Sequence, residues 1–540
     1  MKKADLILRG DAIFDALSDR PEGGFVAVSG NRILAVGKGA DGREYEGEGT
    51  KVFDLGGRLI MPGFHDSHVH LLMAGMYRSC PDLQDAKSEE QACRMLKDFV
   101  DKSPAPEEWV IGFGWYQIYW DSQKLPTAAS LDRYFPDRPC FLLNAELHGV
   151  WVNSKAMEIA GITKDTPDPL GGIIERDAQG NPTGFLYETA IGLVGAHALK
   201  FATGQEKRYL RAFMEEAARQ GITSVNDLMP YFSGNIGNVS TYAEMDREGE
   251  LTIRINAAPD LLGDLDEVCR WREAYTSEKI TVRLLKQFLD GVATTHTALM
   301  LEDYSDAPGN RGIPLTDLEE IRRAVPEAHK RGLSVKLHSC GDASARFAID
   351  CYEEAVRLHG DNGCRHAIEH LELIDPADLP RIKALGIIPS MQPEHIAAPT
   401  YEGSVYPARF GPERMKMAWA CKSLLDASGV IAIGTDCPVV ESNPFLEIFR
   451  AVTRVHSDGK PEGGDNPAEK LTMAEVLRGY TYGSAYGVRR EGDLGTLEAG
   501  KLADIAVIDR NLFALSDNEE ILDAQVCLTI MDGRVIYQKL

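Results

Sequence analysis

The chain has 540 residues, and its 58 lysine and arginine residues against 82 aspartate and glutamate residues give a formal net charge of −24. Such an acidic surface repels phosphate backbones and anionic lipid, so we expect neither a nucleic-acid-binding nor a membrane-surface protein. The ten cysteines form no C-x-x-C pair, and the sequence shows neither a signal peptide nor a run of 18 apolar residues. These features are typical of a cytoplasmic protein with reduced thiols.

The two ends of the chain share one sequence pattern, which is typical of β-strands. The first sixty residues alternate short apolar runs with turn signals, and similar runs return in GTLEAGKLADIAVID and CLTIMDGRVIYQ. The shared pattern predicts one small β-sandwich built from residues 1–60 and 488–540.

Residues 61–487 alternate apolar runs with helical stretches. The eight strand candidates are residues 59–70, 222–228, 252–258, 281–291, 333–341, 364–372, 386–393 and 429–438. This alternation predicts an α/β fold, a (β/α)8 TIM-type barrel whose chemistry lies at the C-terminal ends of the strands. Residues 71–204 break the alternation with aromatic and proline-rich segments, and they predict a large insertion over the barrel mouth.

Candidate metal ligands stand where the predicted strands end. They are His68 and His70 on the first strand, His338 on the fifth, His370 on the sixth and Asp436 on the eighth, while Lys286 lies within the fourth. Side chains two residues apart on a strand point to the same face, so His68 and His70 act together. Neutral imidazoles are good zinc ligands, and catalytic zinc sites keep an open position for water. A lone H-x-H pair is more often structural, but this joint placement predicts a metal site.

Ordered motifs run through nearly the whole chain. They include PGFHDSHVH (62–70), HGVWVNSKAM (148–157), GITSVNDL (221–228), KQFLDGVATTHTALMLEDYSD (286–306), HSCGDASA (338–345), IEHLELI (368–374), MQPEH (391–395) and GTDCPV (434–439). With these motifs the chain resembles the amidohydrolase superfamily, and more closely its YtcJ-like branch, which includes N-substituted formamide deformylases.

The resemblance implies a metal centre with one or two ions, which we expect to be Zn²⁺. Its implied ligands are His68, His70, His338, His370 and Asp436, together with Lys286. Many relatives carry a carbamylated lysine that bridges two metals at the position of Lys286. A free ammonium has no lone pair and cannot ligate, whereas addition of CO₂ turns it into an oxygen ligand. The alternative is an unmodified barrel lysine paired with a carboxylate such as Asp290.

The implied reaction is metal-dependent hydrolysis of a non-peptide carbon–nitrogen bond in a small amide-like molecule, such as an N-formyl or N-acyl amine. We expect Asp436 to accept the proton of the attacking water and to pass it to the leaving amine. His148, from the insertion, is predicted to contact the substrate and to steady the oxyanion, the alternative being a structural histidine in a turn. Asp66 is expected to orient the ligands.

Three further expectations concern residues outside the ligand set. Glu188 is expected on a helix surface or in a salt bridge. His395 is interpreted as structural, although it follows the seventh strand and so deserves the first check. His296 and Ala343 stand where the YtcJ-like branch usually has arginine, so the substrate of known members does not transfer directly.

Two other classes of function remain open. A hydrolytic deaminase of the same superfamily generally uses one metal and lacks the bridging lysine, so Lys286 disfavours it. A non-catalytic binding or regulatory barrel would have lost a ligand, and none of the six is lost. No G-x-x-x-x-G-K-[ST] motif occurs, and we expect no nucleotide cofactor. A homodimer remains an open alternative for the quaternary structure.

Overall fold

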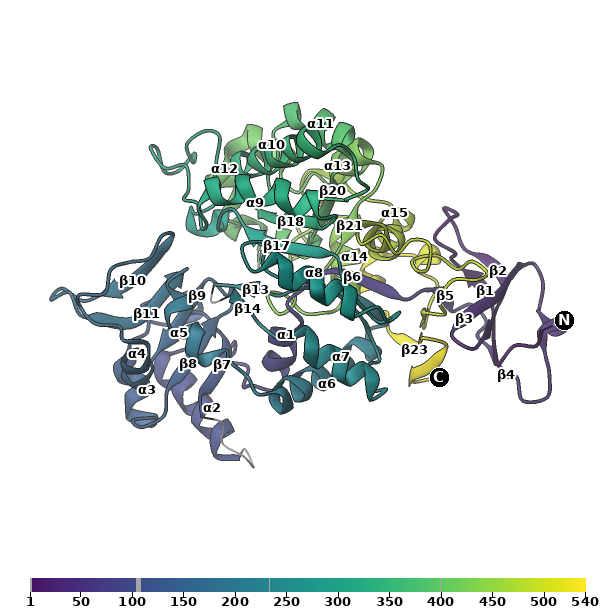
Figure 1. Cartoon of the computed structure of the whole chain (residues 1–540), viewed down its shortest axis with the longest axis horizontal. Helices are drawn as coiled ribbons and strands as arrows, with labels where there is room; N and C mark the ends of the chain where they lie inside the picture. Colours follow the sequence, from purple (N-terminus) through teal and green to yellow (C-terminus); the bar gives the residue numbers. More distant parts are fainter. Residues whose placement is uncertain (1, 103–107, 233, 399) are drawn as a thin grey trace.

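Strands from the two ends of the chain meet in one sheet. The computed structural model describes residues 2–102, 108–232, 234–398 and 400–540, and Figure 1 shows both termini at the same end of the molecule. The eight-stranded sheet has the order β24-β23-β22-β5-β1-β2-β3, with β4 paired to β1. Its strands are β1 (Leu6–Ile13), β2 (Glu22–Ser29), β3 (Arg32–Lys38), β4 (Lys51–Asp54), β5 (Leu59–Pro62), β22 (Ile505–Ile508), β23 (Val526–Met531) and β24 (Arg534–Gln538).

A second sheet comes from the segment that interrupts the strand–helix alternation. It has five strands in the order β10-β11-β9-β8-β7 and lies at the opposite end of the molecule from the termini (Figure 1). Its strands are β7 (Val110–Trp115), β8 (Cys140–Asn144), β9 (Gly149–Val152), β10 (Gly172–Arg176) and β11 (Pro182–Glu188). The helices of this segment are α2 (Glu89–Lys102), α3 (Ala128–Tyr134), α4 (Ser154–Ala160) and α5 (Ile191–Ala198).

The middle of the molecule holds two sheets whose strands all run parallel. One has the order β16-β15-β12-β6 and the other the order β17-β18-β19-β20-β21. Their strands are β6 (Phe64–Val69), β12 (Ile222–Leu228), β15 (Arg254–Ala258), β16 (Ile280–Val282), β17 (Leu284–Phe288), β18 (Ser334–Ser339), β19 (Ala367–His370), β20 (Ile388–Met391) and β21 (Ala432–Ile433). Every residue of β6, β12 and β18 is buried, as expected for parallel strands covered on both faces.

The two central sheets touch at both of their edges. Only Arg283 separates β16 from β17, and isolated parallel bridges join Asp260 to Lys286 and Val69 to Cys437. Each of the eight predicted strand segments contains an observed strand, so these predictions and the α/β class are confirmed. Among the described residues the contact between the sheets consists of isolated bridges and not of continuous ladders.

Helices follow the central strands in turn and cover them from outside (Figure 1). They are α1 (Leu71–Arg78), α6 (Thr203–Arg219), α7 (Val239–Arg247), α8 (Leu265–Ala274), α9 (Leu318–Lys330), α10 (Asp342–His359), α11 (Leu379–Leu385), α13 (Cys421–Ser428) and α14 (Pro444–Thr453). Helix α9 shows why they form: the Asp317 side chain accepts a hydrogen bond from the Glu319 N–H, and Ile321, Val325 and Ala328 are buried along one face. No helix in the described ranges is long and apolar enough to cross a membrane.

Candidate metal centre

The predicted ligands come from the ends of five central strands. His68 lies in β6 and His70 immediately after it, Lys286 in β17, His338 in β18, His370 at the end of β19, and Asp436 three residues beyond β21. His370 and Asp436 have left-handed backbone angles, with φ of 74° and 65°. Non-glycine residues adopt this conformation rarely and at a cost, so the surrounding fold holds both side chains in place.

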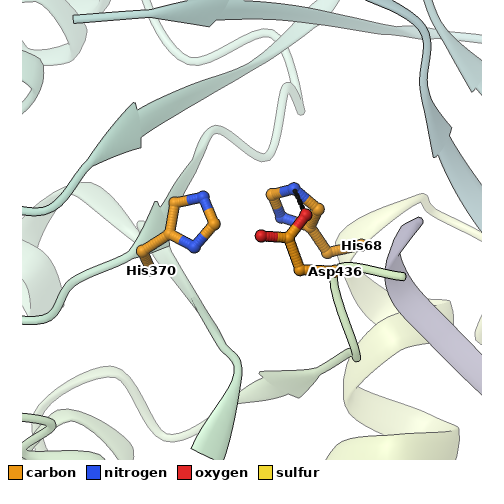
Figure 2. A group of neighbouring side chains, drawn as sticks. All are labelled: His68, His370 and Asp436. Carbon is orange, nitrogen blue, oxygen red and sulfur yellow. Dashed lines mark ion pairs between the residues drawn. The ribbon is translucent and has the colours of Figure 1, made fainter. Parts of the chain in front are cut away.

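Three of these residues have ligand atoms close enough to one another to bind the same metal ion. One ligand atom each from His68, His370 and Asp436 can be chosen so that all lie within 4.8 Å of one another, and all three residues are buried. Figure 2 shows Asp436 beside His68, with His370 facing them from another strand. The Asp436 Oδ1 lies 3.2 Å from His68 Nε2 and 3.3 Å from His70 Nε2, so His70 joins the same group.

The tautomers of His68 and His70 follow from their second ring nitrogens. His68 Nδ1 lies 2.6 Å from Glu369 Oε2, and His70 Nδ1 lies 2.8 Å from the Leu228 carbonyl oxygen. Both partners are acceptors, so each neutral ring carries its proton on Nδ1 and turns the Nε2 lone pair toward Asp436. Burial lowers the pKa of His70, which keeps its ring neutral at pH 7.

The remaining two ligands lie nearby but outside the close group. His338 Nε2 lies 3.3 Å from the Gly291 carbonyl oxygen, and its ring centroid lies 4.3 Å from that of His370. Lys286 is completely buried, and its ammonium nitrogen lies 5.0 Å from the centre of the Phe288 ring. Burial lowers the pKa of Lys286 to about 8, against an ordinary value of 10.5.

The donor set fits a cation. Among the described residues, His68 Nε2, His370 Nδ1, Lys286 Nζ and Asp436 Oδ1 are all buried side-chain atoms without a hydrogen-bond partner. Buried polar atoms are normally satisfied, and imidazole lone pairs facing a carboxylate oxygen at 3.2–3.3 Å are unfavourable unless a positive charge lies between them. Nitrogen and carboxylate donors of this kind suit zinc, so the residues fit the metal that the sequence predicts.

A buried charge network holds the first ligand. Glu369 accepts hydrogen bonds from His68 Nδ1 and, at 2.5 Å, from Lys336 Nζ, which also donates to the Ser67 carbonyl oxygen at 3.1 Å. Burial alone would raise the pKa of Glu369, but the Lys336 ammonium and His68 hold it well below its usual range. A carboxylate at this position fixes the orientation and the tautomer of the His68 ring.

Asp66 and Asp290 have structural partners of their own. Asp66 accepts hydrogen bonds from the backbone N–H groups of His68 and Thr435 and from the Thr435 hydroxyl, so it supports the segments beside two ligands. Asp290 accepts hydrogen bonds from three backbone N–H groups of the loops after β17 and β18 and from the Ser344 hydroxyl of α10, and not from Lys286. The alternative pairing of Lys286 with Asp290 is therefore wrong.

A cavity of about 210 Å³ opens beside these ligands. Its lining residues are Glu146, His148, Val292, Thr294, His338, Cys340, His370, Glu372, Glu394, His395, Ala397, Tyr406, Asp436, Val439 and Val440. His395 lines this cavity, and its Nε2 lies 3.6 Å from Asp436 Oδ2, so its interpretation as a structural residue stays a prediction. Its position after the seventh strand was the only sequence signal for this placement.

His148 reaches the cavity from the loop between β8 and β9. Its Nδ1 lies 2.6 Å from Glu188 Oε2, and Glu188 Oε1 accepts a hydrogen bond from the Thr297 hydroxyl. Burial alone would lower the pKa of His148, but the Glu188 carboxylate raises it to about 9. Glu188 ends β11 and is 4% exposed, so its expected place on a helix surface is wrong, whereas the expected salt bridge is confirmed.

Glu372 was missed at the sequence level. It is 3% exposed, it lines the cavity, and its Oε2 is a buried atom without a hydrogen-bond partner in the described part of the chain. Burial and the negative charge of Asp290 raise its pKa to about 8. The only signal was its position two residues after His370, at the end of a predicted strand.

The chain belongs to the amidohydrolase family, whose pattern matches residues 51–537. It is 30% identical to Protein LONG AFTER FAR-RED 3 of Arabidopsis thaliana over 99% of this chain and 92% of that protein. It is likewise 30% identical to the putative amidohydrolase YtcJ of Bacillus subtilis over 92% of each chain. Identity to the N-substituted formamide deformylase of Arthrobacter pascens is 28% over 95% of each chain. The resemblance drawn from the motifs is thereby confirmed.

A solved structure supports the same assignment. An uncharacterised metal-dependent hydrolase from Pyrococcus horikoshii superposes with a TM-score of 0.76 at 25% identity, covering 94% of this chain and 98% of the other. Because 94% of this chain is covered, most of the terminal sheet and of the inserted sheet lies within the shared architecture.

Proposed function

We propose that the protein is a metal-dependent hydrolase of a non-peptide carbon–nitrogen bond in a small N-formyl or N-acyl amine. One observation carries the proposal: the orphaned buried atoms of His68, His370, Lys286 and Asp436 converge beside a cavity that His148 also lines. The names of two similar proteins, an N-substituted formamide deformylase and a metal-dependent hydrolase, support the same chemistry.

Zinc, as one ion or two, would be held by the predicted ligands His68, His70, Lys286, His338, His370 and Asp436. A bound zinc ion lowers the pKa of a water to about 7 and polarises a carbonyl group. The chain's own contribution is to keep the imidazoles neutral and oriented, since burial lowers the pKa values of His70, His338 and His370. Neutral imidazoles keep the lone pairs that a metal requires.

Lys286 is suited to carbamylation. Only a neutral amine attacks CO₂, forming a C–N bond and releasing one proton. Burial without a hydrogen-bond partner lowers the pKa of Lys286 to about 8, which increases the neutral fraction at pH 7. The resulting carbamate is an anionic oxygen ligand, and it would satisfy an atom that the described residues leave unpartnered.

Asp436 is placed to move the proton. Its Oδ1 faces His68 and His70, whereas its Oδ2 faces the cavity side, 3.6 Å from His395 Nε2. Burial alone would raise the pKa of Asp436, but His68 and His70 hold it well below its usual range, so it is ionised and ready to accept. We assign to it the transfer of a proton from water to the leaving amine.

His148 is placed to act on the substrate. With a pKa of about 9 it is protonated at pH 7, and its pairing with Glu188 through Nδ1 leaves Nε2–H as a donor. A charged donor beside the cavity stabilises an oxygen that becomes negative as the carbonyl carbon is attacked. A residue of the inserted segment thus completes the reaction site.

The two central sheets support a finer description of the fold. We interpret them as the two halves of a (β/α)8 barrel spanning residues 61–487, because their strands are parallel and bridges join both edges. Residues 1–60 and 488–540 form a separate composite β domain, and residues 71–204 contribute the cap. The presence of Glu146 and His148 in the cavity wall supports this role for the cap.

The test is a screen of N-formyl and N-acyl amines with zinc-loaded protein and mass analysis of the products. We expect a carboxylic acid and a free amine, and we expect elemental analysis to find at least about one metal per chain. Release of ammonia from an amidine or imine ring, without amide cleavage, would instead establish the deaminase. Full activity of metal-free protein would refute the metal assignment.

A further inference from the structure

The cavity beside the candidate metal centre is lined by more acidic than basic side chains. Besides Asp436 it is lined by the carboxyl groups of Glu146, Glu372 and Glu394, and its lining residues include no lysine or arginine. The one cationic group beyond the predicted ligands is His148, which is paired with Glu188. Away from His148 and the predicted metal ligands, a carboxylate or phosphate on the substrate would therefore find no cationic side chain among the lining residues.

The three carboxyl groups are not equivalent. Glu394 is neutralised by Arg450, whose guanidinium donates to both of its oxygens at 3.0 and 3.1 Å. Glu372 has no such partner: its Oε2 is buried and makes no hydrogen bond with any described residue. A buried carboxyl oxygen without a donor costs folding free energy. An ammonium group bound against Glu372 would supply the missing donor and would favour the ionised carboxylate, which burial alone disfavours.

From this geometry we propose that the substrate carries a protonated amine, which Glu372 binds while the metal centre cleaves an amide at the other end. The proposal rests on the hydrolase function proposed above and names its substrate class, a mono-N-acylated or N-formylated diamine. Glu146 lines the same cavity as a second carboxyl group. The apolar Val292, Val439 and Val440 provide the wall along which a methylene chain packs.

The overall charge of the molecule favours the same ligand. A net charge of −24 surrounds the cavity with a negative potential, which attracts small cations and raises their association rate. The same potential slows the approach of anionic amides. Selectivity for an ammonium group therefore comes both from the long-range electrostatic potential and from direct contact with Glu372.

The experiment compares three amides that share one N-formyl group and similar length: N-formyl-1,4-diaminobutane, N-formylpentylamine and N-formyl-4-aminobutanoate. We expect kcat/KM to be about 10- to 100-fold higher for the ammonium compound than for the neutral one, and lowest for the carboxylate. In Glu372→Gln the ratio of ammonium to neutral substrate is expected to fall at least about tenfold. The matched control Glu215→Gln, whose side chain is 73% exposed on α6, should keep the wild-type ratio.

Binding provides a readout without turnover. Calorimetry of the same three compounds with zinc-loaded Asp436→Asn should show the same order of affinities, and the order should vanish when Glu372→Gln is added. A neutral amide that reacts and binds as well as the ammonium compound, or an unchanged ratio in a folded Glu372→Gln variant, would overturn the inference. Cleavage of all three at equal rates would keep the hydrolase and refute the ammonium site. Selective binding of the ammonium compound without cleavage of any of the three would keep the ammonium site and refute the hydrolase function.

Discussion

Replacement of Glu369 by glutamine is the most informative single change in the charge network behind the metal centre. Glu369 is fully buried and joins two groups, the Lys336 ammonium at 2.5 Å and His68 Nδ1 at 2.6 Å. Glutamine keeps the shape but removes the negative charge. Lys336, which is 3% exposed, would then keep only neutral acceptors, among them the Ser67 carbonyl oxygen.

The expected cost follows from that geometry. Removing one partner of a buried ion pair typically costs about 3–5 kcal/mol, and we expect the lower end because an amide oxygen still faces Lys336. An unfolding entropy of about 2.1 cal/mol/K per residue, summed over 540 residues, converts about 3 kcal/mol into a Tm decrease of about 3 °C. Loss of the carboxylate behind His68 should also weaken zinc affinity by about 10–100-fold.

The assay combines thermal unfolding of metal-free protein with zinc titration against a competing chelator. The double variant Lys336→Met with Glu369→Gln removes both charges, so it should recover most of the lost stability but not the zinc affinity. A Glu369→Gln protein with wild-type Tm would refute the argument from the buried charge. A double variant no more stable than the single one would do the same, because the cost would then come from packing.

The remaining predictions concern the reaction groups. Lys286→Ala should lose one or both metals by elemental analysis, and short carboxylic acids should restore part of the rate; full metal content with no effect of added acid would exclude the bridging role. Asp436→Asn should retain much of the metal yet lower kcat by about 10²–10⁴-fold, and a rate near wild type would exclude the proton shuttle. His148→Ala should lower turnover with metal content nearly unchanged, whereas loss of metal would make it a ligand. Because Glu188 raises the pKa of His148 to about 9, wild-type kcat/KM should fall as pH rises through about 9. In Glu188→Gln that decline should begin at lower pH, and an unshifted profile would exclude the pairing.

Local pattern was sufficient to predict where the central parallel strands are, but not the strands of the inserted sheet. The segment ITSVNDL coincides with β12, and the other apolar runs between turn signals each contain a strand. Placement of His338, His370 and Asp436 at strand ends followed directly, because parallel strands of one layer end on the same side. The sequence therefore predicted that His370, Asp436 and His68 lie close together, but it did not predict the distances between their ligand atoms.

The partners of these ligands were not predictable, since they depend on contacts between distant segments. Glu369 bonds His68 across 301 positions of sequence, and nothing in the residues around His68 indicates such a partner. Glu188 was expected on a helix surface or in a salt bridge, yet the pairing of β11 with β10 extends the strand to this residue, opposite Gly172. The role of His395 likewise depended on where the loop after β20 returns.

The junction between β5 and β6 has a consequence for the order in which the protein can be assembled. Only Gly63 separates the two strands, and a Cβ there would lie 2.3 Å from the Thr223 hydroxyl, so the junction is held tightly. Strand β5 pairs with β22, which the ribosome makes about 440 residues later, roughly 20–90 s at the usual rates of synthesis. Throughout that interval β5 has an open edge directly upstream of His68. The last predicted ligand, Asp436, is itself made about 370 residues after His68, so the predicted ligand set is complete only late in the synthesis of this chain.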